Sequence, residues 1–328
     1  MPLDHAALTL PMHERWFVGS RPAGDWSFFL QPLPLLLTAT VVAVTVVWRL
    51  LALRRDRPEL SLLSPLGRLV PWIPRLLGIH LGVSLLALAA TGAFITPAID
   101  QLDGIGGHAL LLAEGALGVW LVSGYRLRSA AVLVLALGPI LGVVADWSAL
   151  GECANLAAVA AFLVVVPPGP DAYGVARPST RDLRWALFIL RFGVGVALIV
   201  LAFTEKLTNP AMALETLRDY PTLDVFGLVG IHLSPTTFVY VAGATELLFG
   251  LLVISGAFPQ VATLVAMVPF NATLLLFGQT EMVGHLPVYG VFLALLAYGS
   301  NAETAPLVRW LPSPTARRTS RARGLLVS

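Results

Sequence analysis

The sequence contains little charge and almost no cysteine. Only 12% of its 328 residues are charged, whereas 57% are hydrophobic and the mean hydropathy is +0.81. A soluble domain usually carries about a quarter charged residues, so this composition excludes an ordinary soluble enzyme. The single cysteine, Cys153, excludes disulfides within the chain, CxxC redox pairs and thiolate metal clusters. Any redox chemistry therefore needs a borrowed cofactor.

Common catalytic motifs are also absent from the sequence. It contains no P-loop, no HExxH pair, no CxxCH haem-attachment site, no dinucleotide-binding GxGxxG and no serine nucleophile elbow. The basic C-terminal stretch, residues 313–324, is typical of a topology anchor on the inner leaflet. We therefore expect no nucleic-acid partner, and the sequence leaves open whether the protein is an enzyme.

Long hydrophobic runs dominate what the sequence does contain. A bilayer-spanning helix needs about 20 apolar residues, and runs of roughly that length are bounded by Pro, Gly or charge clusters. They lie near residues 29–51, 75–96, 107–125, 129–147, 153–167, 185–204, 236–257, 259–279 and 284–299. The sequence therefore predicts an all-α polytopic membrane protein with about nine transmembrane helices.

The basic residues predict how the chain is oriented in the membrane. Cytoplasmic loops collect Lys and Arg, and most arginines fall in the segments that are inside if the N-terminus is outside. With an odd number of spans, the C-terminus is then cytoplasmic. Residues 1–28 lack a basic stretch that leads to a small-residue cleavage site, so we expect the first span to be retained.

Two segments of the sequence resemble each other. EGALGVWLVSG begins at Glu114 and ELLFGLLVISG at Glu246, and both are followed by a Pro and then a second Glu at similar spacing. This order predicts one N-terminal helix followed by two tandem parallel four-helix bundles. The chain then divides into an outer N-terminal segment (1–28), a first transmembrane helix with a basic inner loop (29–74), unit one (75–167), an inner linker (168–184), unit two (185–300) and a basic inner tail (301–328).

Three charged residues inside the predicted spans are candidates for function. Glu246 and Glu114 lie near the bilayer centre, where an acid costs about 2.5 to 3.5 kcal/mol and normally has a partner or a task. Each is either a protonated or paired packing residue or a site for a ligand or proton. Arg191 either extends to the inner headgroups or reaches inward to a carboxylate. We expect Arg191 to extend to the inner headgroups.

A second set of polar residues is expected at the outer ends of the spans of unit two. Lys206 is the only lysine, and an interfacial lysine is ordinary at a helix end. His285 follows Glu281 by four residues and shares a helical face with it if the helix extends back that far. Asn271 either lines the same cavity or satisfies a carbonyl freed by Pro269. The candidate cluster is Glu205, Lys206, Glu281 and His285.

These residues do not form a metal site by our interpretation, since one His with one Glu is too few ligands. Unit one has no lysine at the position of Lys206, so unit two is our choice for the active unit. Its longer outer loop, residues 211–233, is partly apolar with helical spacing. We expect this segment to form an interfacial lid over unit two.

Residues 180–300 resemble the DoxX-like family of four-helix bacterial membrane proteins. The similarity lies in Arg-Phe-Gly from Arg191, KLTNP from Lys206, ELLFGLLVISG from Glu246 and GHLP from Gly284. Unit one is similar to a diverged second copy. The resemblance implies a protein of the bacterial cytoplasmic membrane. Some relatives are subunits of thiosulfate:quinone oxidoreductase, and others are associated with oxidative-stress complexes.

Three hypotheses about function follow. The first is an accessory subunit of a membrane redox system that binds a quinone or lipid at Glu246, with the outer residues gating the site. The second is a proton-coupled small-molecule transporter that uses Glu114 and Glu246. The third is a structural or chaperone-like partner of another membrane protein. The lipid bilayer and membrane redox subunits are the expected partners, and a quinone is the one cofactor that we consider.

Overall fold

The computed structural model describes residues 24–53, 59–96, 99, 102, 104–144, 147–168, 178–228 and 230–312. This part of the chain is all-helical, and its only β-type contact is an isolated bridge between Phe94 and Thr96. Most of the predicted outer N-terminal segment and of the basic inner tail lies outside the described residues.

Each predicted hydrophobic segment contains a helix in the described part of the chain. The helices are α3 (Pro32–Ala52), α4 (Ile73–Thr91), α5 (Gly104–Ser123), α6 (Leu127–Val144), α8 (Ala154–Val165), α9 (Thr180–Leu201), α12 (Pro235–Ser255), α13 (Pro259–Phe277) and α14 (Gln279–Ser300).

Six helices of the described residues are long and apolar enough to cross a membrane. They contain α3, α4, α5, α9, α12 and α14, whereas α6, α8 and α13 have shorter apolar stretches. The 12 residues of α8 rise about 18 Å, well below the roughly 30 Å of a hydrocarbon core. The protein is thus an all-α membrane protein with six candidate spans, and the count of nine stays a prediction.

Two irregular helical segments extend the long helices. η1 (Ser61–Trp72) is a 3-10 helix that leads into α4, and it contains Pro65 and Pro71. η2 (Ala202–Leu207) is a π-helix that continues α9 and carries two charged residues. A π-turn is rare and often occurs at a functional site, because its wider turn changes the direction of the side chains.

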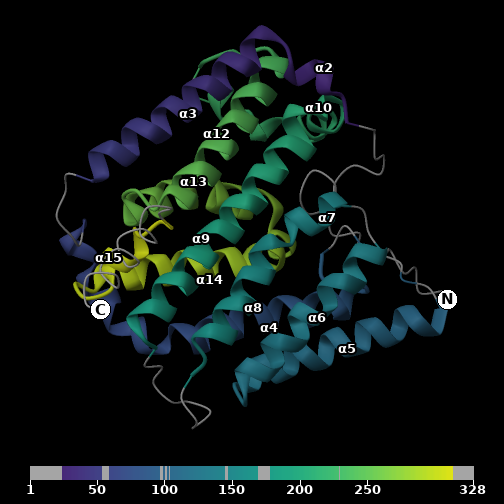
Figure 1. Cartoon of the computed structure of the whole chain (residues 1–328). Helices are drawn as coiled ribbons and strands as arrows, with labels where there is room; N and C mark the ends of the chain where they lie inside the picture. Colours follow the sequence, from purple (N-terminus) through teal and green to yellow (C-terminus); the bar gives the residue numbers. More distant parts are fainter. Residues whose placement is uncertain are drawn as a thin grey trace, which may run out of the picture.

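Four helix pairs organise the molecule (Figure 1). α4 packs along α5 and α9 packs along α12, so the first two helices of each predicted unit are neighbours. α8 packs mainly against α9, and α14 mainly against α4. The fourth helix of each unit therefore contacts the first helix of the other unit more extensively than that of its own. The two units interlock instead of standing as separate bundles.

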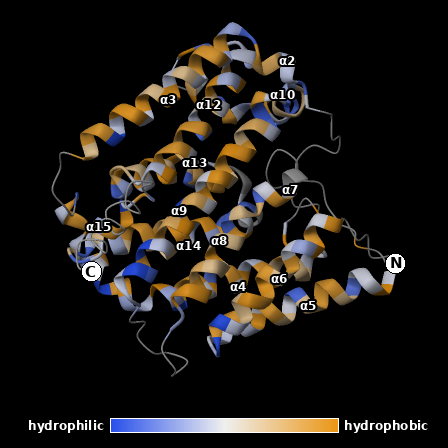
Figure 2. Ribbon diagram, in the orientation of Figure 1, coloured by the Kyte–Doolittle hydropathy of each residue, from blue (hydrophilic) through white to orange (hydrophobic). Residues whose placement is uncertain are grey.

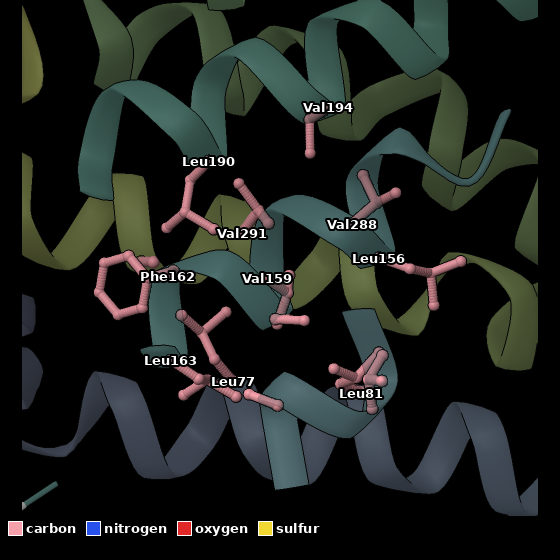
Figure 3. Packing of buried hydrophobic residues seen from close by; sticks show 14 of the residues in the cluster. Leu77, Leu81, Leu156, Val159, Phe162, Leu163, Leu190, Val194, Val288 and Val291 are labelled. Atoms are coloured by element: carbon pink, nitrogen blue, oxygen red, sulfur yellow. The ribbon is translucent and has the colours of Figure 1, made fainter. Parts of the chain in front are cut away.

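The buried core lies where α4, α8, α9 and α14 meet (Figure 3). Apolar side chains from all four helices interdigitate there and are almost completely buried. They include Leu77, Leu81, Val159, Phe162, Leu163, Leu190, Val194 and Val291. Since two of these helices come from each unit, this core holds the units together.

The outer faces of the helices are also apolar (Figure 2). α3 runs along α12 at one edge of the molecule and buries little of its own surface. Leu36, Val46 and Val47 on α3 are more than half exposed. Exposed apolar side chains along a whole helix are unfavourable in water and favourable in lipid, which agrees with a membrane environment.

Glycines allow close approach of the two paired helices. A Cβ added to Gly250 of α12 would lie 2.8 Å from the carbonyl oxygen of Gly195 on α9. A Cβ on Gly118 of α5 would lie equally close to the carbonyl oxygen of Gly82 on α4. Gly118 and Gly250 occupy matching positions in the two similar segments. Both helix pairs therefore use the same small-residue contact, which is common between membrane helices.

Candidate functional site

A cavity of about 360 Å³ lies in unit two. It is lined by α9, η2, α12, α13 and α14, and by the short helices α10 (Pro210–Asp219) and α11 (Val225–Leu228). Most of its wall is apolar, with four phenylalanine side chains among the lining residues. These are Phe226, Phe238, Phe249 and Phe270.

One charged pair crosses this cavity's wall from η2 to α12. The Nζ of Lys206 lies 3.1 Å from a carboxylate oxygen of Glu246 and 3.7 Å from one of Glu205. The side chains of Lys206 and Glu246 are 16% and 18% exposed, whereas that of Glu205 is buried. One ammonium group therefore bridges two carboxylates at the edge of an apolar space.

A second polar pair comes from the start of α14. Nδ1 of His285 lies 3.2 Å from Oε1 of Glu281, and both side chains are buried. α14 begins at Gln279, so Glu281 is within the helix and the predicted spacing of four residues places both groups on one face. The sequence-based prediction that this pair shares a face is confirmed.

All four residues of the predicted outer cluster converge on the cavity, and Glu246 lines it as well. Glu205, Lys206, Glu246, Glu281 and His285 all line it. The cluster contains both hydrogen-bond donors and acceptors beside aromatic rings. Within the described residues, no three His, Cys, Asp or Glu side chains are grouped closely enough to hold a metal ion.

Asn271, a separate candidate, does not line the cavity. Its Nδ2 donates to the carbonyl oxygen of Met267 at 2.8 Å, one turn back on α13. Its Oδ1 accepts from the hydroxyl of Tyr289 at 3.3 Å. Asn271 therefore joins α13 to α14 on the exposed side.

The segment that was predicted to form an outer lid lines the cavity. α10 contributes Thr216, and the following turn and α11 contribute Leu223, Val225 and Phe226. Met212 and Ala213 on α10 are buried, whereas Arg218 is 72% exposed in its side chain. The segment thus has an apolar face toward the bundle, as expected for a lid.

Glu114 has different surroundings from its counterpart Glu246. It is completely buried, and its Oε1 accepts from the backbone N–H of Ile95 at 2.9 Å. Ile95 has a φ of 61°, which is strained for a β-branched residue. Phe94 beside it is also fully buried. The backbone of a buried loop therefore partners Glu114 in unit one, whereas Lys206 partners Glu246 in unit two.

Arg191 neither extends to the surface nor reaches a carboxylate among the described residues. It is completely buried and donates to the carbonyl oxygens of Ile254, at 2.9 Å, and Trp310. Our expectation that it extends to the headgroups is therefore wrong. The reason is that α12 ends at Ser255 beside it and leaves unpaired carbonyl oxygens for the guanidinium.

Arg75 makes the corresponding contact in unit one. It donates to the carbonyl oxygens of Leu121 and Val122 at the end of α5. Val122 and Ile254 occupy matching positions in the two similar segments. Arg191 and Arg75 thus connect the first and second helices of their units, and neither lines the cavity.

Sequence reasoning missed the aromatic wall of the cavity. Phe249 follows Glu246 by three residues, and Phe270 follows Pro269 directly. The helical spacing of Phe249 was a usable signal, because residues three apart share a face. Phe226 and Phe238 had no such signal, since their place depends on how the lid folds over the bundle.

The fold and the site define an all-helical membrane protein with an apolar cavity whose wall carries a Lys–Glu and a His–Glu pair. No family model matches the chain, and no curated protein or solved structure matches it. The assignment as an all-helical membrane protein therefore rests on the helices and the cavity of the chain itself.

Proposed function

We propose that this protein is a DoxX-like accessory subunit of a membrane redox system and binds a quinone in the cavity of unit two. The observation that carries the proposal is the combination of an apolar, phenylalanine-rich cavity with two polar pairs on its wall. The volume of about 360 Å³ suits a small ring-bearing ligand.

The lining residues fit the chemistry of a quinone ring. Phenylalanine rings provide flat apolar contacts for the ring, and Lys206 can donate a hydrogen bond to one carbonyl oxygen. His285, held by Glu281, can exchange a proton with a ring oxygen. A bound quinone supplies the two-electron chemistry that the amino acids lack.

The membrane arrangement belongs to the same proposal. We place the protein in a bacterial cytoplasmic membrane with nine spans, the N-terminus outside and the C-terminus in the cytoplasm. Three arginines support a common inner end: Arg49 donates to the carbonyl oxygens of Ser255 and Arg309, and Arg191 donates to that of Ile254. The cavity's Glu205 and Lys206 lie at the other end of α9.

The division into two tandem units is supported by the matched contacts of Arg75 and Arg191 and by the matched glycine contacts. Unit two is the binding unit in this proposal, because the equivalent position in unit one is taken by the buried loop at Phe94 and Ile95.

Quinone binding is tested on the full chain purified in lipid nanodiscs. Mass spectrometry of a solvent extract should find a co-purified quinone, and added menaquinone or ubiquinone should raise the melting temperature. A hydrogen bond to a charged group contributes about 1.5 to 3 kcal/mol, so Lys206→Met should weaken quinone binding by roughly tenfold or more.

Arg218→Met is the matched control, since Arg218 is an exposed cation on α10 and does not line the cavity. Its quinone affinity should equal that of the wild type. An extract with phospholipid alone, together with no thermal shift on adding either quinone, would overturn the proposal.

A further inference from the structure

A second, smaller cavity of about 50 Å³ lies at the boundary between the two units. All four core helices contribute to its wall. Ser84 comes from α4, Asn155 from α8, Val194 from α9 and His285 from α14. The cavity therefore lies between the interlocked helices described above.

One buried side chain at this cavity needs a hydrogen-bond donor. Asn155 is only 7% exposed, and its Oδ1 accepts no hydrogen bond from the described residues. A buried amide oxygen without a donor is costly, so native proteins normally satisfy it with a protein group or an ordered water.

Other polar groups surround the same space. The hydroxyl of Ser84 donates to the carbonyl oxygen of Val283 at 3.0 Å, and a hydroxyl oxygen retains lone pairs that can accept. Glu152 and Thr96 also line the cavity. A water inside it therefore meets several polar partners, as buried waters require.

We propose that this cavity is an internal hydration site, in which ordered water donates to Oδ1 of Asn155 and bridges the two units. One buried water needs roughly 10 to 15 Å³ of cavity volume, so the cavity of about 50 Å³ has room for about three to five waters. The proposal stands on the volume and on the amide of Asn155, and it does not depend on the ligand of the larger cavity.

His285 gives this water a role in the proposed quinone site. It lines both cavities, together with Leu198 and Phe270. With water on the far side, the imidazole has a proton-exchange partner even when a lipophilic ligand fills the larger cavity. This consequence rests on the proposed function, whereas the hydration site itself does not.

The test is an experimental density map of the wild-type protein in nanodiscs, compared with maps of two variants. The wild type should show water density in contact with Asn155. Asn155→Leu should remove that density, because it replaces the amide by an apolar group of similar size. Asn155→Ser, the matched control, keeps a polar group and should retain water.

A dry wild-type cavity, in a map that shows buried water elsewhere in the protein, overturns the proposal. So does an Asn155→Leu map with unchanged water. If Asn155→Leu does not fold, the wild-type map decides alone. A quinone that fails to bind contradicts the proposed function and leaves this result intact, so the two failures are distinguishable.

Discussion

The ion pair between Lys206 and Glu246 provides a quantitative test of the site. Lys206→Met removes the ammonium group and keeps a flexible side chain of similar length. Glu246 and Glu205 then lose the ammonium group that lies 3.1 and 3.7 Å from their carboxylate oxygens. We expect the variant to unfold more easily than the wild type.

The distance and the burial determine the size of the effect. At an effective dielectric constant of about 20, two unit charges 3.1 Å apart attract each other by about 5 kcal/mol before desolvation is subtracted. Removing one partner of a buried pair costs about 3 to 5 kcal/mol. Both side chains keep some contact with solvent, at 16% and 18% exposure, so the lower value of about 3 kcal/mol applies.

A double-mutant cycle isolates the pair. The free energy of unfolding is measured in detergent micelles for the wild type, Lys206→Met, Glu246→Gln and the double variant. The coupling should be about 2 kcal/mol, because the second substitution costs less once the first has removed the charge partner. The contact between Lys206 and Glu205 is lost in both Lys206 variants, so its contribution cancels in the cycle.

Arg218→Met is the control for a surface cation. Arg218 lies 3.7 Å from Glu215, but its side chain is 72% exposed. Exposed pairs contribute only about 0 to 1 kcal/mol, so the variant should stay close to the wild type. If Lys206→Met is as stable as Arg218→Met, or if the coupling is near zero, the structural argument for the pair is refuted.

Five further substitutions test the packing. Gly250→Ala should lower the free energy of unfolding by about 1 to 3 kcal/mol, because its Cβ would meet a backbone oxygen at 2.8 Å. Gly138→Ala, whose Cβ would have nothing within 4 Å, should raise the free energy of unfolding by about 0.5 to 1 kcal/mol. Equal shifts in melting temperature for the two variants would contradict this. Glu114→Leu should lower the free energy of unfolding by about 1 to 3 kcal/mol, because the Ile95 N–H loses its acceptor. Glu114→Gln keeps an acceptor oxygen, so it should retain most of the wild-type stability in the same unfolding assay. Arg191→Met should cost about 2 to 4 kcal/mol in thermal unfolding, because two carbonyl oxygens lose their donor; wild-type stability would show that these bonds contribute little.

The helices could be predicted from the sequence because each long apolar run is a local signal. The run around Glu246 and the run around Glu114 became α12 and α5. The pairing of Glu281 with His285 was predictable for the same reason, since residues four apart on one helix are neighbours. The mixed polarity of residues 211–233 predicted a lid, and four residues of this segment line the cavity, namely Thr216, Leu223, Val225 and Phe226.

The partners of Arg191 could not be predicted from its neighbours in the sequence. Its partners, the carbonyl oxygens of Ile254 and Trp310, are 63 and 119 residues away in the chain. Hydropathy places the arginine at a depth in the membrane, but depth alone does not say which helix end lies beside it. The sequence analysis therefore considered headgroups and a carboxylate as partners of Arg191, but not backbone carbonyl oxygens.

By itself, the sequence determined that the chain prefers lipid to water, which segments form helices and which few charged residues must be accommodated within them. Only the tertiary structure decided that α8 and α14 each pack mainly against the first helix of the other unit. It also decided that Glu246 faces a cavity, whereas Glu114 lies against a buried loop. The physical reason is that helix formation and amphipathic faces depend on neighbours within about one turn, whereas helix pairing depends on shape complementarity between segments far apart in the chain. The cavity between the helices is a product of that pairing.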